Sequence, residues 1–168
     1  GNEQVTQYYV VSLIGKTLVL LIAPINTIVI SYLTKRKERL TRSQFGKAVL
    51  AGGGVSLVFF VACQIGTPLF VWLFYRNLYE SVKGIVTVVN LAQILGLFSA
   101  FLFILVLTFT DERWQLWIQL THFCILLVSS VLAARTYGMM GFAVASLGAN
   151  SLRVAAVVIL GIVKAGKD

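Results

Sequence analysis

The chain has 168 residues, of which 58% are hydrophobic and 12% are charged, and its formal net charge is +8. Soluble domains carry about 25% charged residues, so this composition excludes an ordinary soluble protein and indicates helices surrounded by lipid. Many of the basic residues lie in one short stretch, residues 35–47, between two apolar segments. Such a cluster is typical of a cytoplasmic loop near anionic lipid headgroups, and nucleic-acid binding is not expected.

Five apolar segments are long enough to cross a bilayer, which takes about 20 residues of helix. They span residues 8–34, 46–74, 83–110, 114–134 and 139–163. We therefore expect an all-α fold, a polytopic bundle of five transmembrane helices that forms a single membrane domain over residues 1–168. The basic loop 35–47 is too short and too polar to form a domain of its own.

The distribution of cations predicts the orientation of these helices. With the loop 35–47 in the cytoplasm, nine Lys and Arg residues lie on the cytoplasmic side and three, Arg76, Lys83 and Arg135, lie outside. Positive charge is enriched in cytoplasmic segments, so the N-terminus is expected outside and the C-terminus inside. An odd number of crossings with an outer N-terminus fits the C-terminal piece of a longer protein.

The first apolar segment, 8–34, contains both a cation and a proline. Helical spacing places Lys16 on one face with Ser12 and Tyr9. Pro24 lies deep in the same helix, where it removes a backbone donor and predicts a kink. The kink has two readings, a packing feature or a discontinuous helix that lines a transport pathway.

The third and fourth segments each carry a row of polar side chains. Asn90 belongs to the row in 83–110, and Gln119 and His122 belong to the row in 114–134. In lipid such groups must face protein or water, so they either bond to other helices or line a cavity. His122 is the only histidine, and with no nearby carboxylate a metal site is not expected.

The fifth segment, 139–163, has two different faces. Ser146, Asn150 and Arg153 share the polar face, which is expected to point into a cavity. The opposite face carries the small residues Gly141, Ala145 and Gly148, which favour close packing against another helix. Arg153 is eleven residues from Lys164, about 16 Å of helix, so its side chain cannot easily reach the interface.

Lys16 and Arg153 are the two cations inside apolar segments, and none of the five segments contains an acid within its apolar run. A Lys or Arg near a helix centre costs about 2.5–3.5 kcal/mol on insertion scales. A wet cavity or an anionic ligand would offset that cost. The sequence also lacks nucleotide-binding and hydrolase motifs and any pair of intramembrane carboxylates, so an enzyme is not expected and no cofactor is implied.

Three stretches resemble the C-terminal half of polysaccharide flippases of the MATE/MOP superfamily, which move O-antigen and other lipid-linked oligosaccharides. The first is residues 2–5 leading into Tyr8-Tyr9, then a long proline-containing helix and a basic loop. The second is residues 68–70, followed by Tyr75 and Tyr79. The third is residues 137–145, similar to the tyrosine-glycine turn that opens one of the last helices of a lobe. Within it Phe142 departs from the family pattern, as does Arg135 just before it.

The resemblance implies that the five helices are part of one lobe of a two-lobed transporter whose other lobe is the partner. It implies a multi-pass protein of the bacterial inner (plasma) membrane, with a periplasmic N-terminus and a cytoplasmic C-terminus, in polysaccharide or lipopolysaccharide biosynthesis. It also implies a cationic cavity that receives the diphosphate and sugars of a polyprenyl-linked oligosaccharide. The residues expected to contact this substrate are Lys16, Arg153, Asn150, Ser146, Gln119, His122 and Asn90.

Two other functions remain open from the sequence. A multidrug exporter of related fold would carry cationic substrates, which Lys16 and Arg153 would repel. A membrane scaffold or assembly subunit without transport activity would use the small-residue face of 139–163 for binding, and its two cations would anchor to membrane lipids.

Overall fold

The structure of the protein is a computed structural model that describes residues 2–35 and 40–166. It confirms the all-α fold. The helices are α1 (Asn2–Lys35), α2 (Arg42–Phe74), α3 (Arg76–Val82), α4 (Val86–Leu107) and α5 (Glu112–Lys164). Within the described residues, α1, α2, α4 and α5 are long and apolar enough to cross a membrane, which indicates a multi-pass membrane protein.

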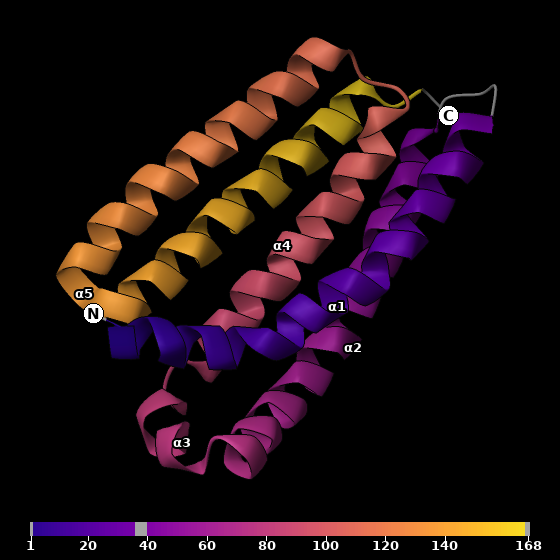
Figure 1. Ribbon diagram of the computed structural model, residues 1–168. Coiled ribbons are helices and arrows are strands. Elements are labelled where there is room, and N and C mark those ends of the chain that lie inside the picture. The colour runs from indigo at the N-terminus through magenta and orange to yellow at the C-terminus, as the bar shows by residue number, and fades with distance from the viewer. Residues whose placement is uncertain (1, 36–39, 167–168) are drawn as a thin grey trace.

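Helix α5 has 53 residues, about 80 Å if it were straight, whereas the hydrocarbon core is about 30 Å thick. It folds back on itself at Gly138, whose φ of 60° and ψ of −139° are non-helical. Figure 1 shows the two arms of α5, coloured orange and yellow, lying side by side. The arms, residues 112–137 and 139–164, correspond to the predicted crossings 114–134 and 139–163.

The turn between the arms depends on two glycines. Gly138 is the only described residue with a positive φ. Residues other than glycine rarely adopt its backbone conformation. One turn later, a methyl group on Gly141 would overlap the carbonyl of Ala133. The absence of a side chain at Gly141 therefore lets the second arm begin directly against the first.

The predicted loop 35–47 is wrong in its bounds, because helix covers both of its ends. Lys35 is the last residue of α1, and α2 begins at Arg42. Thr41 caps α2 by accepting a hydrogen bond from the backbone of Gln44, whose side chain accepts one from the backbone of Thr41. This capping box starts the helix early, so Lys47 is helical. Residues 36–39 lie outside the described residues.

Helix α1 begins at Asn2, well before the expected start of its crossing at residue 8. Its 34 residues amount to about 51 Å of helix, more than one crossing needs. Figure 1 shows its first turns running across the ends of α4 and α5 before the helix rises beside α2. Two contacts hold these turns: Tyr8 packs edge-on against Phe142 at 4.9 Å, and Gln7 donates to Ser81 at 3.3 Å.

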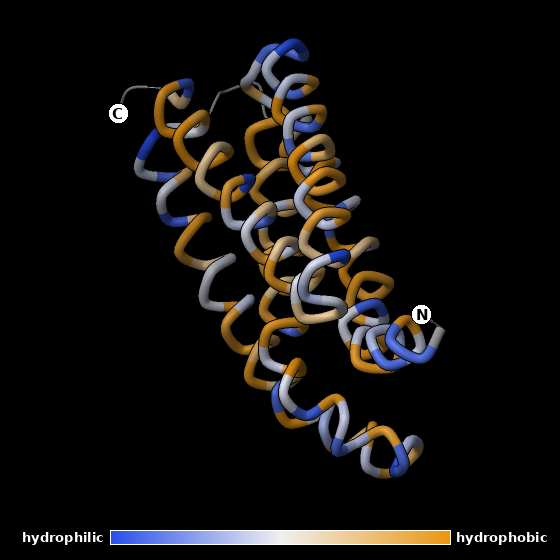
Figure 2. Tube along the Cα trace, turned by 90° about the vertical axis from the view of Figure 1, so that its left-hand side faces the viewer, coloured by the Kyte–Doolittle hydropathy of each residue, from blue (hydrophilic) through white to orange (hydrophobic). Residues whose placement is uncertain are grey.

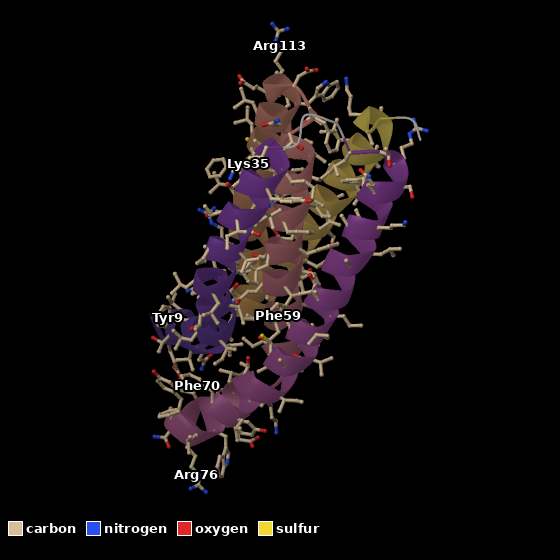
Figure 3. All side chains as sticks on the ribbon, turned by 90° about the vertical axis from the view of Figure 1, so that its right-hand side faces the viewer. Tyr9, Lys35, Phe59, Phe70, Arg76 and Arg113 are labelled. Atoms are coloured by element: carbon tan, nitrogen blue, oxygen red, sulfur yellow. The ribbon has the colours of Figure 1, made fainter. Side chains whose placement is uncertain are left out.

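The charged residues mark the two ends of the bundle. Figure 3 shows Lys35 and Arg113 at one end and Arg76 at the opposite end, as expected for helices that cross alternately. Figure 2 shows hydrophobic residues along much of the helix shafts, with hydrophilic residues gathered toward the ends. The chain therefore has the layout of a membrane-spanning bundle, with polar ends and an apolar middle.

The core consists of two apolar clusters, one toward each end. Phe45 is fully buried at the Lys35 end and packs edge-on against Phe109 at 6.0 Å. The cluster at the other end joins the start of α1 to α3, α4 and the second arm of α5 through Val11, Val82 and Val89. These clusters fix α4 in the middle of the bundle, where it contacts α1, α2 and both arms of α5.

Candidate functional site

Arg153 lies on the second arm of α5, and its positive charge has no acidic partner in the described part of the chain. Its guanidinium lies over the ring of Phe103 on α4, with 5.5 Å between the guanidinium carbon and the ring centroid. Its Nε atom is enclosed and donates to nothing. The two ion pairs among described residues, Lys83–Glu80 and Lys164–Asp111, lie near the ends of the bundle.

A cavity of about 330 Å³ runs along the seam between the two arms of α5. Arg153 and His122 line it, together with Thr121 and the two indole rings of Trp114 and Trp117. Trp114 lies in the first turns of α5, so the cavity extends from that end of the bundle inward to Arg153. We call this space the α5 seam cavity.

A chain of hydrogen bonds crosses three helical segments beside this cavity. Asn150 Nδ2 donates to the carbonyl of Ala92 on α4 at 2.8 Å. Its Oδ1 atom therefore faces His122 Nε2 on the first arm, at 3.2 Å. Gly96 makes room for this amide, because a methyl group there would lie 3.2 Å from Asn150 Nδ2. The amide thus connects both arms of α5 to α4.

The predicted polar face of the fifth segment is only partly turned to the α5 seam cavity. Arg153 lines the cavity, whereas Ser146 is buried and Asn150 uses both ends of its amide within the bundle. The opposite face, predicted to pack closely, is divided. Gly141 is buried at the turn, whereas Gly148 is exposed, and a methyl group there would meet no neighbouring helix within 4 Å.

Asn90 lies between α4 and α2, where it is only 1% exposed. Its Nδ2 atom donates to the carbonyl of Cys63 at 3.1 Å and to Gln64 Oε1 at 3.0 Å. Its Oδ1 atom accepts from Thr67 Oγ1 at 3.2 Å. The structure therefore places Asn90 in a polar contact between two helices, apart from the α5 seam cavity.

Gln119 and Lys16 line other surfaces. Gln119 borders a neighbouring hollow together with Phe103, whose ring also lies against Arg153. Lys16 is exposed on α1, and its ammonium lies 4.5 Å from the centroid of the Tyr9 ring, toward the start of that helix.

Lys16 and Arg153 lie at different levels along α4. Gly15, next to Lys16, packs against Gln93 of α4, whereas Arg153 packs against Phe103. These two α4 residues are ten positions apart, about 15 Å along the helix. Among the described pockets, none is lined by both cations.

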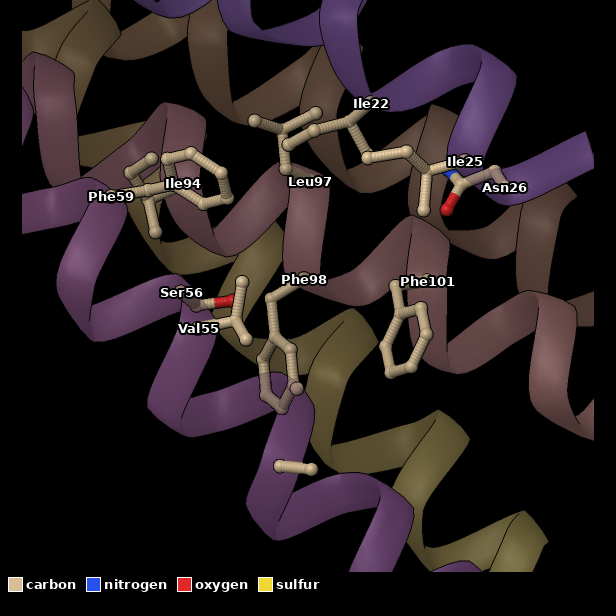
Figure 4. A pocket seen from close by; sticks show the side chains of 12 residues that line it. Ile22, Ile25, Asn26, Val55, Ser56, Phe59, Ile94, Leu97, Phe98 and Phe101 are labelled. Atoms are coloured by element: carbon tan, nitrogen blue, oxygen red, sulfur yellow. The ribbon is translucent and has the colours of Figure 1, made fainter. Parts of the chain in front are cut away.

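An apolar hollow of about 260 Å³ lies between α1, α2 and α4. Figure 4 shows Phe59, Phe98 and Phe101 lining it, with Asn26 and Ser56 at its edge. It has no charged lining residue, so its chemistry suits hydrocarbon and gives no means of holding a charged group.

Two residues near Arg153 were not expected from the sequence: Phe103, whose ring lies against the guanidinium, and Thr121, which lines the α5 seam cavity. Phe103 is one of several aromatic residues in a continuous apolar run, and nothing in its spacing marks it. Thr121 is a single hydroxyl that directly precedes His122, and it does not belong to the predicted row of polar residues. In the part of the chain that the structure describes, no group of three His, Cys, Asp or Glu residues could hold a metal ion.

Comparison with known proteins adds no relative to this description. No protein-family model, no curated protein and no solved structure matched the chain. The features of this chain that point to a function are therefore the unpaired Arg153 guanidinium and the cavity beside it.

Proposed function

We propose that this chain is part of a membrane transporter that flips an anionic polyprenyl-diphosphate-linked oligosaccharide across the bacterial inner membrane. The observation that carries the proposal is Arg153, a membrane cation with no acidic partner among the described residues and an enclosed Nε without an acceptor. A phosphate bound at the terminal nitrogens of the guanidinium would offset the cost of the charge, since guanidinium groups bind phosphates by paired hydrogen bonds.

The surroundings of Arg153 suit a ligand with both a charged and an apolar part. Two indole rings line the α5 seam cavity, and the side chains around its mouth face outward, with Trp117 63% exposed and Leu152 59% exposed. An opening of this kind lets a lipid-linked headgroup enter from the side while its hydrocarbon chain stays in the membrane. A second lobe packed over the exposed faces would complete the cavity, and rocking of the two lobes would alternate its access.

The competing functions fit this site less well. A cationic drug would be repelled by Arg153. A scaffold without transport activity is favoured by one observation, the contact of Lys16 with Tyr9, because it directs that ammonium toward the start of α1, as a lipid-anchored lysine would be. The Arg153 side chain is not directed toward lipid headgroups in this way, since its guanidinium lies against Phe103. The proposal involves transport without chemical conversion of the substrate.

The test is delivery of surface polysaccharide in cells that depend on the gene. We expect Arg153→Gln to abolish delivery, because the variant keeps a polar side chain of similar reach but removes the charge. Arg135→Gln is the matched control, since Arg135 is an exposed cation on the same helix and lies outside the α5 seam cavity. Membrane levels of each variant are measured by immunoblot.

Normal delivery by Arg153→Gln at normal membrane levels would overturn the proposal. Lys16→Gln separates the two cations. A loss of delivery in Lys16→Gln as well would place Lys16 in the pathway with Arg153, and unchanged delivery would make it an anchor.

A further inference from the structure

The orientation of the His122 ring is fixed by its neighbour. Asn150 Nδ2 donates to the carbonyl of Ala92, so the amide oxygen is the atom that faces His122 Nε2. An amide oxygen only accepts hydrogen bonds. His122 Nε2 must therefore carry a hydrogen and donate it, which makes Nδ1 the bare nitrogen of the neutral imidazole.

The bare nitrogen is available to a ligand. His122 Nδ1 has no hydrogen-bond partner among the described residues, and it is not one of the enclosed atoms without a partner. His122 and Arg153 line the same cavity. The α5 seam cavity thus presents a permanent cation and, beside it, a hydrogen-bond acceptor.

This pair has a defined chemical preference. Arg153 donates and attracts anionic oxygens, whereas the Nδ1 atom of a neutral histidine attracts a hydroxyl hydrogen and offers nothing to a phosphate oxygen. The other lining side chains with a polar atom, those of Thr121, Trp114 and Trp117, are uncharged. A ligand that satisfies both residues carries a phosphate and a hydroxyl close together, as in a sugar joined through its anomeric oxygen to a diphosphate.

We propose that His122 is a specificity-determining residue that accepts a hydrogen bond from a hydroxyl of the sugar attached to the diphosphate, while Arg153 holds the diphosphate itself. The proposal rests on the proposed function and assigns it a recognition element for the first sugar. Asn150 acts through His122 as a positioning residue, since its amide oxygen fixes which ring nitrogen is bare.

The experiment measures binding of two soluble probes with equal charge to the full chain in lipid nanodiscs. One probe is glucosyl geranyl diphosphate, and the other is the methyl ester of geranyl diphosphate, which lacks the sugar hydroxyls. The chain has three tryptophans, and Trp114 and Trp117 line the cavity. In a Trp72→Phe background these two report binding by their fluorescence.

His122→Gln is the decisive variant, because its amide N–H can still reach Asn150 while the acceptor at the position of Nδ1 is lost. We expect this variant to bind the glucosyl probe about three- to tenfold more weakly, the effect of one hydrogen bond, and to bind the methyl probe as the parent does. His122→Asn keeps an amide oxygen near the position of Nδ1, so it should retain part of the preference for the glucosyl probe. Thermal unfolding of each variant checks folding.

The outcomes separate this proposal from the proposed function. Equal weakening of both probes by His122→Gln, or no change in either, overturns the role of His122. Unchanged binding of both probes by Arg153→Gln overturns the diphosphate site but leaves the His122 comparison standing. If the parent chain binds neither probe, both the role of His122 and the proposed function are overturned.

Discussion

Replacing Asn90 with alanine tests whether this residue serves packing or ligand contact. The sequence predicts a substrate-binding role, whereas the structure buries Asn90 between α4 and α2 with three hydrogen bonds. The two roles give opposite results. A packing residue changes the free energy of unfolding, and a ligand residue changes transport at unaltered stability.

The expected magnitude follows from the bonds that Asn90→Ala removes. Asn90 contacts Cys63, Gln64 and Thr67 through hydrogen bonds of 3.0–3.2 Å. Interhelical hydrogen bonds in membranes average about 0.6 kcal/mol each, so the loss of three amounts to about 2 kcal/mol. Thr87→Ala is the control, because Thr87 is exposed and accepts a single bond from Gln64 at 2.9 Å, which predicts about 0.6 kcal/mol.

The assay is reversible unfolding in mixed micelles with increasing denaturing detergent, followed by far-ultraviolet circular dichroism. A double-mutant cycle of Asn90→Ala with Thr67→Val isolates the bond between these two side chains, for which we expect a coupling of about 0.6 kcal/mol. The packing argument would be refuted if Asn90→Ala lowered stability no more than Thr87→Ala does and still abolished polysaccharide delivery.

The same unfolding assay tests the tight contacts of α5. Gly161→Ala should destabilise the chain by about 1–3 kcal/mol, because the added methyl would overlap the buried ring of Phe45. Gly148→Ala is its control. The added methyl would meet no neighbouring helix within 4 Å, so alanine should stabilise the helix by about 0.5–1 kcal/mol. Equal effects of the two would contradict the packing described. Gly138→Ala should cost about 1–3 kcal/mol, because φ is 60° there; an unchanged midpoint would show that the turn has another conformation.

Hydrophobic length predicted the long apolar helical segments, and local interactions decided where the helices begin and end. Continuous apolar runs identify membrane helices without reference to neighbours. The early start of α2 was also readable, since Thr41 and Gln44 have the spacing of a capping box. The first turns of α1 were not, because their position depends on Phe142 and Ser81, which come from distant parts of the chain.

The sequence predicted that the candidate site contains an unpaired positive charge, but it predicted only some of the residues around that charge. The cost of an unpaired cation identifies Arg153 without any structure. Helical periodicity then grouped Ser146 and Asn150 with it, but a shared face does not reveal which helix that face meets. The structure shows that Asn150 bonds to α4 and that Phe103 lies under the guanidinium, and both contacts depend on how α4 packs against α5.

The polar residues of this bundle can be sorted by what their hydrogen-bonding groups still lack. Asn90 and Asn150 have partners at both ends of their amides, and replacing such a partner by a ligand would cost the bundle a contact it already has. Arg153 and His122 differ, because both line one cavity, the Arg153 guanidinium has no carboxylate partner and His122 Nδ1 has no donor among the described residues. Binding a ligand at these two residues breaks no existing bond. Substrate contact is therefore expected at the seam of α5, and the amides around it hold the helices that form the seam.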